Sequence, residues 1–288
     1  MPWQLVLALF LVFSSASNLF RRKLAEQYPD NPVINLTMMY LFAVVPLGIV
    51  GAFIIGDPDI SGVTGWNWLQ IALGGLLYSS GFVAGLKANE TLDAGQFGVI
   101  ATLITPVAIL GSTIFLDQGL NSTQTFGVLL ILLGAIAVTS TTFNSETFRP
   151  TKPTGLALLF AGLVGVGFVN ESHLINSVGL ATYLIVGWGG QLVAYMVLSN
   201  RKLVSIPQLV KQSSFKLVAA SGLTLALSGL CVVYALSVIN ASVVSGVTAY
   251  QSAVTVLGSI VILRETKHLW LKIAATTIAT IGLVMVAV

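Results

Sequence analysis

Long apolar stretches recur along the whole chain and are separated by short polar segments. An α-helix needs about 20 apolar residues to cross the hydrocarbon core of a bilayer, and each stretch has roughly that length. The strict alternation that indicates membrane β-strands is absent. The pattern therefore predicts an all-α polytopic membrane protein with ten transmembrane helices. The expected helices cover residues 3–21, 33–55, 66–86, 95–116, 124–142, 154–172, 177–198, 217–237, 242–263 and 270–288.

Composition supports a lipid environment. Only 8% of the 288 residues are charged, and 56% are hydrophobic, whereas a soluble domain carries roughly 25% charged residues. The mean hydropathy of the chain is +0.93. Cys231 is the only cysteine, so an intrachain disulfide is excluded. No stretch fits a soluble domain.

Basic residues sort to one side of the ten-helix arrangement. All 13 lysines and arginines flank the loops that follow odd-numbered helices, beginning with Arg21, Arg22 and Lys23. The positive-inside rule places these loops in the cytoplasm, so both termini are predicted to be non-cytoplasmic. The expected location is multi-pass in the plasma (inner) membrane. Residues 1–4 lack the cations of a secretion signal, which favours a retained first helix over cleavage near Ser14–Ser17.

An internal repeat relates the two halves. A shift of 148 positions places Gly98 on Gly246 and Asp117 on Glu265. Each half holds an odd number of helices, five, so the second half must enter the bilayer from the opposite face, as in inverted-repeat transporters. The expected domains are a first five-helix repeat over 1–142, a cytoplasmic linker over 143–153 and a second repeat over 154–288.

Two five-helix halves of this kind resemble the EamA type of the drug/metabolite transporter superfamily. The resemblance covers nearly the whole chain and includes "ASN" near the end of the first span and the acids of "LD" and "RE" closing the fourth and ninth spans. It also includes Gly134 and Gly282. The usual proline of the fourth span is Pro106, whereas Val254 stands at the matching place in the ninth. The resemblance implies transport of a small metabolite, with export the commoner direction.

Polar residues inside the spans are the candidate binding groups, because an unpaired polar group in hydrocarbon costs free energy. A midplane site between the halves would use such groups. The alternative for each is a packing role, in which the side chain bonds its own backbone or a neighbouring helix. The candidate substrate-binding residues are Asn18, Tyr78, Ser79, Thr102, Asn170, Trp188, Gln191, Tyr250 and Gln251.

Carboxylates are expected only at the ends of spans, with Glu171 the best candidate for a proton-sensitive pair through His173. A solvated position for Glu171 in a loop is the simpler expectation. A central region without charge predicts a neutral or zwitterionic substrate such as an amino acid or a sugar-like molecule. Pro46 and Pro106 are expected to kink the second and fourth spans.

A secondary transporter of a small organic metabolite, working by alternating access, is the function that this pattern favours. The alternative is a non-transporting membrane protein, such as a lipid-handling or assembly factor. An enzyme is not expected, because metal-ligand clusters and phosphate-binding loops are missing from the sequence. No cofactor and no nucleic-acid partner are expected. The expected partners are a small-molecule substrate and membrane lipids, and a homo-oligomer is left open.

Overall fold

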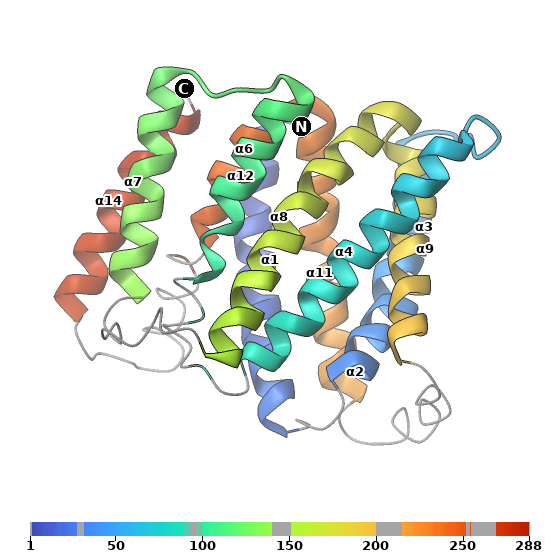
Figure 1. Ribbon diagram of the computed structural model, residues 1–288, viewed down its shortest axis with the longest axis horizontal. Coiled ribbons are helices and arrows are strands. Elements are labelled where there is room, and N and C mark those ends of the chain that lie inside the picture. The colour runs from blue at the N-terminus through green and yellow to red at the C-terminus, as the bar shows by residue number, and fades with distance from the viewer. Residues whose placement is uncertain are drawn as a thin grey trace.

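A computed structural model describes residues 2–27, 32–89, 92, 97, 100–139, 151–199, 215–251, 254 and 269–287. Every regular element in these ranges is helical, which confirms the all-α class. Six of the described helical segments are long and apolar enough to cross a membrane. The protein is therefore an integral multi-pass membrane protein, and its helices run side by side in one bundle (Figure 1).

The described helices follow the expected spans closely. Their bounds are α1 Trp3–Gln27, α2 Pro32–Met39, the π-helix η1 Tyr40–Val44, α3 Val45–Ile55, α4 Gly65–Asn89, α6 Ile104–Leu116, α7 Ser122–Thr139, α8 Lys152–Val178, α9 Leu180–Ser199, α11 Phe215–Val238, α12 Ala241–Ala249 and α14 Leu269–Ala287. Two helices continue six residues beyond their expected ends, α1 to Gln27 and α8 to Val178. The helix α6 begins at Ile104 where the sequence predicts a start at residue 95, and α12 ends at Ala249 where it predicts an end at residue 263. The linker 143–150, Glu265, and Gly98 of the repeat lie outside the described residues.

The helical structure is irregular beside Pro46 and Pro106, the two prolines that were expected to kink their spans. The segment that crosses at Val33–Ile55 changes to a π-helix at Tyr40–Val44, directly before Pro46. Proline has no N–H to donate, so the backbone hydrogen-bond pattern must change on its N-terminal side. Ahead of Pro106 the chain forms a turn, and the N–H of Thr105 bonds the carbonyl of Thr102.

A reciprocal pair of hydrogen bonds caps the start of α4. At the start of α4, the N–H of Asn67 donates to Thr64 Oγ1 at 3.2 Å, and the N–H of Thr64 donates to Asn67 Oδ1 at 3.1 Å. In the preceding connection, hydrogen bonds from Ser61 and Gly62 lower the pKa of the exposed Asp59 carboxyl. The N–H of Asp59 also donates to Thr182 Oγ1 at 3.0 Å, which fastens the connection to α9.

Small residues allow paired helices to pack closely. The most extensive pairs are α7 with α14, α4 with α8 and α1 with α11, followed by α4 with α9, α6 with α8, α3 with α9 and α6 with α12. Along α4, a Cβ added at Gly81 would lie 2.9 Å from Val164, and one at Gly85 would lie 2.7 Å from Phe160. The Gly81-x-x-x-Gly85 stripe is thus a close-packing face toward α8, as its spacing predicts.

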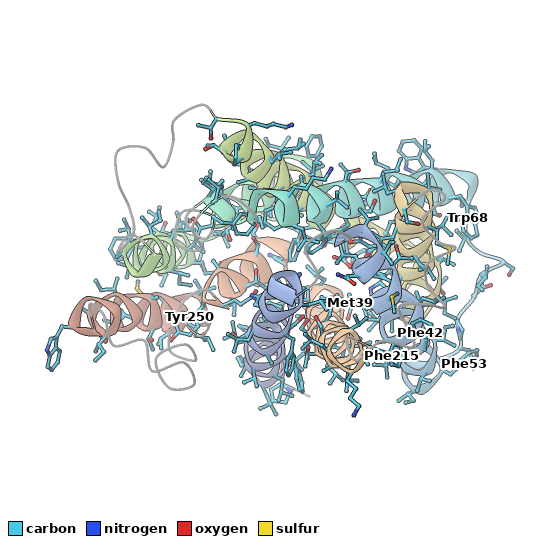
Figure 2. The ribbon with its side chains drawn as sticks, turned by 90° about the horizontal axis from the view of Figure 1, so that it is seen from below. Met39, Phe42, Phe53, Trp68, Phe215 and Tyr250 are labelled. Carbon is cyan, nitrogen blue, oxygen red and sulfur yellow. The ribbon has the colours of Figure 1, made fainter. Side chains whose placement is uncertain are left out.

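Large apolar side chains cover the outer surface of the bundle. Phe53 is 65% exposed and Trp68 47% exposed, and both lie at the periphery in Figure 2. Continuous outward apolar surface of this kind is normal in lipid and rare in soluble monomers. The start of α1 and the end of α14 lie at one end of the bundle, and the end of α4 and the start of α8 at the other (Figure 1).

Candidate functional site

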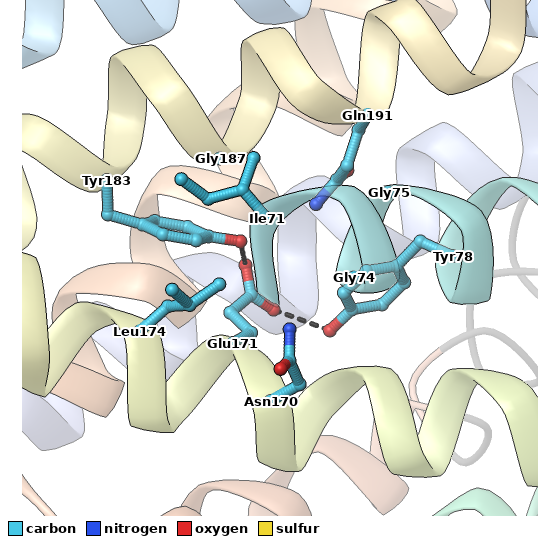
Figure 3. Close-up of a pocket in the computed structure, with 10 residues that line it drawn as sticks. All are labelled: Ile71, Gly74, Gly75, Tyr78, Asn170, Glu171, Leu174, Tyr183, Gly187 and Gln191. Carbon is cyan, nitrogen blue, oxygen red and sulfur yellow. Dashed lines mark hydrogen bonds between the residues drawn. The ribbon is translucent and has the colours of Figure 1, made fainter. Parts of the chain in front are cut away.

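A small polar pocket lies between α4, α8 and α9 in the interior of the bundle (Figure 3). Its cavity measures about 10 Å³, which is room for about one water molecule. Its lining residues are Ile71, Gly74, Gly75, Tyr78, Asn170, Glu171, Leu174, Tyr183, Gly187 and Gln191. We refer to these ten residues as the polar pocket.

Glu171 is the charged group of the polar pocket, and only 7% of its surface is exposed. Tyr78 on α4 donates its hydroxyl to Oε2 at 2.5 Å, and Tyr183 on α9 donates to Oε1 at 2.7 Å. Figure 3 shows the two tyrosines converging on the carboxyl from opposite sides. Each carboxyl oxygen thus has one hydroxyl donor, and the carboxyl joins three helices.

Glycines bring these helices close enough for the side chains to meet. A Cβ added at Gly75 would lie 2.8 Å from the carbonyl oxygen of Gly190 on α9. One added at Gly74 would lie 2.6 Å from Nδ2 of Asn170 on α8. Asn170 Nδ2 in turn donates to the backbone carbonyl of Gln70 at 3.0 Å. The glycine pair of α4 therefore fixes both neighbouring helices against it.

A second group of polar side chains extends from the polar pocket toward α1. Tyr40 of η1 donates its hydroxyl to Gln191 Oε1 at 2.6 Å, and its ring lies 4.7 Å from the ring of Tyr195. The hydroxyl of the fully buried Tyr195 has no hydrogen-bond partner among the described residues. Arg21 of α1 donates to Asn18 Oδ1 and lies 5.9 Å from the Phe82 ring centre.

The sequence-based placement of Glu171 was wrong. Glu171 was expected at the end of a span, solvated, or paired with His173, and it is instead buried inside α8. Two tyrosines on other helices donate hydrogen bonds to its carboxyl, and these bonds offset part of the cost of burying it. The sequence also predicted a central region without charge, and the neutral or zwitterionic substrate was inferred from that prediction. The buried Glu171 shows that this prediction was wrong.

Three of the predicted binding residues meet in the polar pocket. Tyr78, Asn170 and Gln191 come from α4, α8 and α9, and each lines the same cavity. They were chosen only as large polar groups inside spans, and the structure adds Glu171 and Tyr183 beside them. Tyr183 was not predicted, because a tyrosine near the start of a span is usually an interfacial anchor.

The other predicted binding residues lie elsewhere. Asn18 accepts from Arg21, and Ser79 Oγ donates to the Leu76 carbonyl of its own helix at 3.4 Å. Trp188 fills the space left by two glycines, Gly48 and Gly229. These three contacts fit the packing alternative.

Tyr250 lies beyond the end of α12 and shares a 2.6 Å hydrogen bond with Thr280 of α14. Figure 2 places Tyr250 beside α14, at a distance from Phe42 and Phe215 on the opposite flank. Thr102 is buried in the turn before α6, and Gln251 follows Tyr250. None of these three residues lines the polar pocket.

A wider groove opens at the end of the bundle that holds the start of α1 and the end of α14. Its volume is about 510 Å³, which is within the range of pockets that hold small organic molecules. Three residues with amide side chains, Gln4, Gln124 and Asn240, line it from three segments. The complete lining is Trp3, Gln4, Gln124, Val238, Ile239, Asn240, Val243 and Val286.

Comparisons with known proteins agree with this architecture. The model of the EamA-like transporter family matches residues 1–140. A protein of known crystal structure superposes with a TM-score of 0.72 at 16% sequence identity, covering 98% of this chain and 95% of that chain. At this identity the superposition shows a shared fold alone. No curated protein matches the sequence.

Proposed function

We propose that this chain is a secondary carrier of the EamA-like type, which moves a small organic metabolite by alternating access between two inverted halves. The match of that family's model to residues 1–140 supports this, because a member of the family would be a membrane transporter of the drug/metabolite type. The observation that carries the mechanistic part is a polar pocket with a buried carboxyl inside an otherwise apolar bundle. Such groups are costly in a membrane interior unless they serve a ligand or a partner.

The pairing of helices supports the two-half arrangement over 1–142 and 154–288. If the five helices of each half correspond in order, then α1 corresponds to α8 and α4 to α11. Exchanging the halves converts the pair α1 with α11 into the pair α8 with α4, and both pairs are present. The extensive pair α7 with α14 and the smaller pair α6 with α12 join corresponding helices across the same relation, whereas α6 with α8 is more extensive than its counterpart, α1 with α12.

Breaks at matching positions of the fourth and ninth spans add support. The turn before α6 includes Thr102, and α12 ends directly before Tyr250, which lies 148 positions later. The N–H of Tyr250 bonds the carbonyl of Val247, and the N–H of Leu103 bonds that of Ile100, one position away from the matching place. Paired interruptions of this kind accompany substrate sites in inverted-repeat carriers. Val254 replaces the proline in the second half, so proline alone does not cause the break.

The two cavities fit one state of an alternating-access cycle. The groove of about 510 Å³ opens at the end with both helix termini, whereas the polar pocket has room for about one water molecule. In the export direction a substrate would leave through the groove, and separation of α4, α8 and α9 would enlarge the polar pocket. The substrate would be a small organic metabolite, such as an amino acid or a sugar-like molecule, with export favoured.

Transport by the purified protein tests the proposal. Reconstituted vesicles are expected to exchange at least one labelled amino acid or sugar faster than protein-free vesicles. The rate should saturate with concentration, because a carrier has a finite number of sites. Exchange of every compound at the protein-free rate would contradict the proposal and favour the alternative, a lipid-handling or assembly factor.

Water access at mid-depth gives a second test. In a Cys231→Ala background, Asn170→Cys is expected to react with a membrane-impermeant maleimide, because Asn170 lines the polar pocket. Val166→Cys is the matched control, since Val166 lies one helical turn away on α8 and is 50% exposed on the outer face. A lipid-handling or assembly scaffold predicts equal, negligible labelling of both positions.

The orientation inferred from the cations is also testable. Tags at the two termini are expected to be accessible from outside intact cells, because Lys87 and Lys152 lie at the opposite end of the bundle, which the positive-inside rule assigns to the cytoplasm. Protection of both tags until the membrane is permeabilised would reverse the orientation. Protection of a single tag would contradict the ten-span arrangement.

A further inference from the structure

The carboxyl of Glu171 lacks a positive partner within the part of the chain that the structure describes. The polar interactions that act on it come from the hydroxyls of Tyr78 and Tyr183, and no lysine, arginine or histidine contributes one. A carboxylate in a low-dielectric interior is strongly destabilised without a nearby positive charge. The polar pocket is therefore complementary to a cation that the described residues do not supply.

Within the described ranges, hydrogen bonding at the carboxyl is also incomplete. An ionised carboxylate accepts about four hydrogen bonds, and Glu171 receives one on each oxygen. The tyrosines hold the carboxyl in one orientation and leave acceptor capacity toward the cavity, where Figure 3 also places the amide nitrogen of Gln191. A small group with several N–H donors would complete this set.

The size and chemistry of the cavity indicate which cation fits. A protonated primary amine is about as large as one water molecule and offers three donors, as in lysine. The cavity of about 10 Å³ beside Glu171 matches that size. Bulkier cations would meet the helix backbones, because Gly74, Gly75 and Gly187 line the same space.

We propose that Glu171 is the recognition group for a protonated primary amine on the transported substrate, and that Tyr78 and Tyr183 orient its carboxyl for this contact. The proposal rests on the proposed transport function and narrows its substrate class to amines, zwitterionic amino acids included. It excludes uncharged sugar-like molecules, which have no group to neutralise a buried carboxylate.

Binding to the purified full chain tests the proposal. Thermal unfolding in detergent is measured with the twenty common amino acids, a series of alkylamines from methylamine to diaminobutane, the N-acetyl derivative of each compound, and glucose. At least one amine is expected to raise the midpoint, and its N-acetyl derivative should bind at least tenfold more weakly. Stabilisation by an amine and its N-acetyl derivative to the same degree, or by none of the amines, overturns the proposal.

Variants assign the effect to Glu171. Glu171→Gln is expected to lose at least tenfold in affinity for the amine, whereas Glu171→Asp, which keeps the charge, should keep the preference over the N-acetyl form. An unchanged affinity in Glu171→Gln overturns the proposal. The comparison of derivatives on the unaltered chain decides the matter if Glu171→Gln does not fold. Failure of the transport proposal is distinct, because it appears as absent exchange of every compound in vesicles.

The alternative is that the carboxyl of Glu171 binds a proton and not an amine. The ionisable groups that act with it from packed elements are Tyr78 on α4, Tyr183 on α9 and Tyr40 on η1, and His173 lies two residues further on α8. If Glu171 serves a proton alone, Glu171→Gln removes a pH dependence of the midpoint while amines and N-acetyl derivatives stay equivalent. That result overturns amine recognition.

Discussion

Replacing Tyr78 or Tyr183 by phenylalanine is expected to lower the free energy of unfolding by about 1.5–3 kcal/mol, the usual range for a hydrogen bond to a charged group. Each substitution removes one of the two hydroxyl donors of Glu171 and leaves a buried carboxyl oxygen without a partner. The loss should exceed that of an ordinary interhelical hydrogen bond, which averages about 0.6 kcal/mol in membrane proteins.

A double-mutant cycle separates this effect from loss of tyrosine packing. In a Glu171→Leu background the hydroxyls have no carboxyl to bind, so Tyr78→Phe should cost little. Tyr250→Phe is the matched control, because its hydroxyl bonds the neutral hydroxyl of Thr280. Unfolding in a denaturing detergent gives the free energies. A cost for Tyr78→Phe no larger than that for Tyr250→Phe would contradict the interpretation of the Glu171 contacts.

The positions of the spans were predictable because each depends on a local property. A stretch of about 20 apolar residues has few alternatives in lipid, and the described helices follow the expected ranges. The continuation of α8 past residue 172 shows what a local property misses. Glu171 resembles the end of a span in sequence, and only its contacts with Tyr78 and Tyr183, 93 and 12 positions away, allow the helix to continue to Val178.

The candidate site was predictable only in part for the same reason. Tyr78, Asn170 and Gln191 stand out as large polar groups inside spans, so a general rule about burial identifies them. Trp188 meets the same rule, yet it packs against Gly48 and Gly229. Which polar residues share a cavity depends on the glycines that set the distances between helices, and the sequence does not state which glycine faces which helix.

Gly282→Ala is expected to cause the largest loss of stability among single glycine substitutions outside the polar pocket. A Cβ at this position would lie 2.5 Å from the carbonyl oxygen of Gly127 and 2.9 Å from the backbone nitrogen of Ile131. Backbone atoms cannot rotate away as a side chain can, so α7 and α14 must separate. Overpacking costs typically about 1–3 kcal/mol, and the loss here should lie in the upper part of that range.

The backbones of α7 and α14 come closest at Gly127 and Gly282. Gly127 meets Gly282 reciprocally, since a Cβ on Gly127 would lie 2.7 Å from the Gly282 carbonyl oxygen. The two helices lie at one side of the bundle, where α7 packs mainly on α14 (Figure 1). Separating them removes apolar contacts along both helices, so the cost spreads beyond the crossing point.

Gly162→Ala is the matched control for Gly282→Ala. Gly162 lies within α8, and an added Cβ would meet nothing within 4 Å. Alanine is the better helix former by about 1 kcal/mol, so Gly162→Ala should leave the unfolding midpoint unchanged or raise it. Thermal unfolding of both variants in the same detergent gives the comparison. A midpoint for Gly282→Ala equal to that of Gly162→Ala would show that α7 and α14 do not cross backbone to backbone.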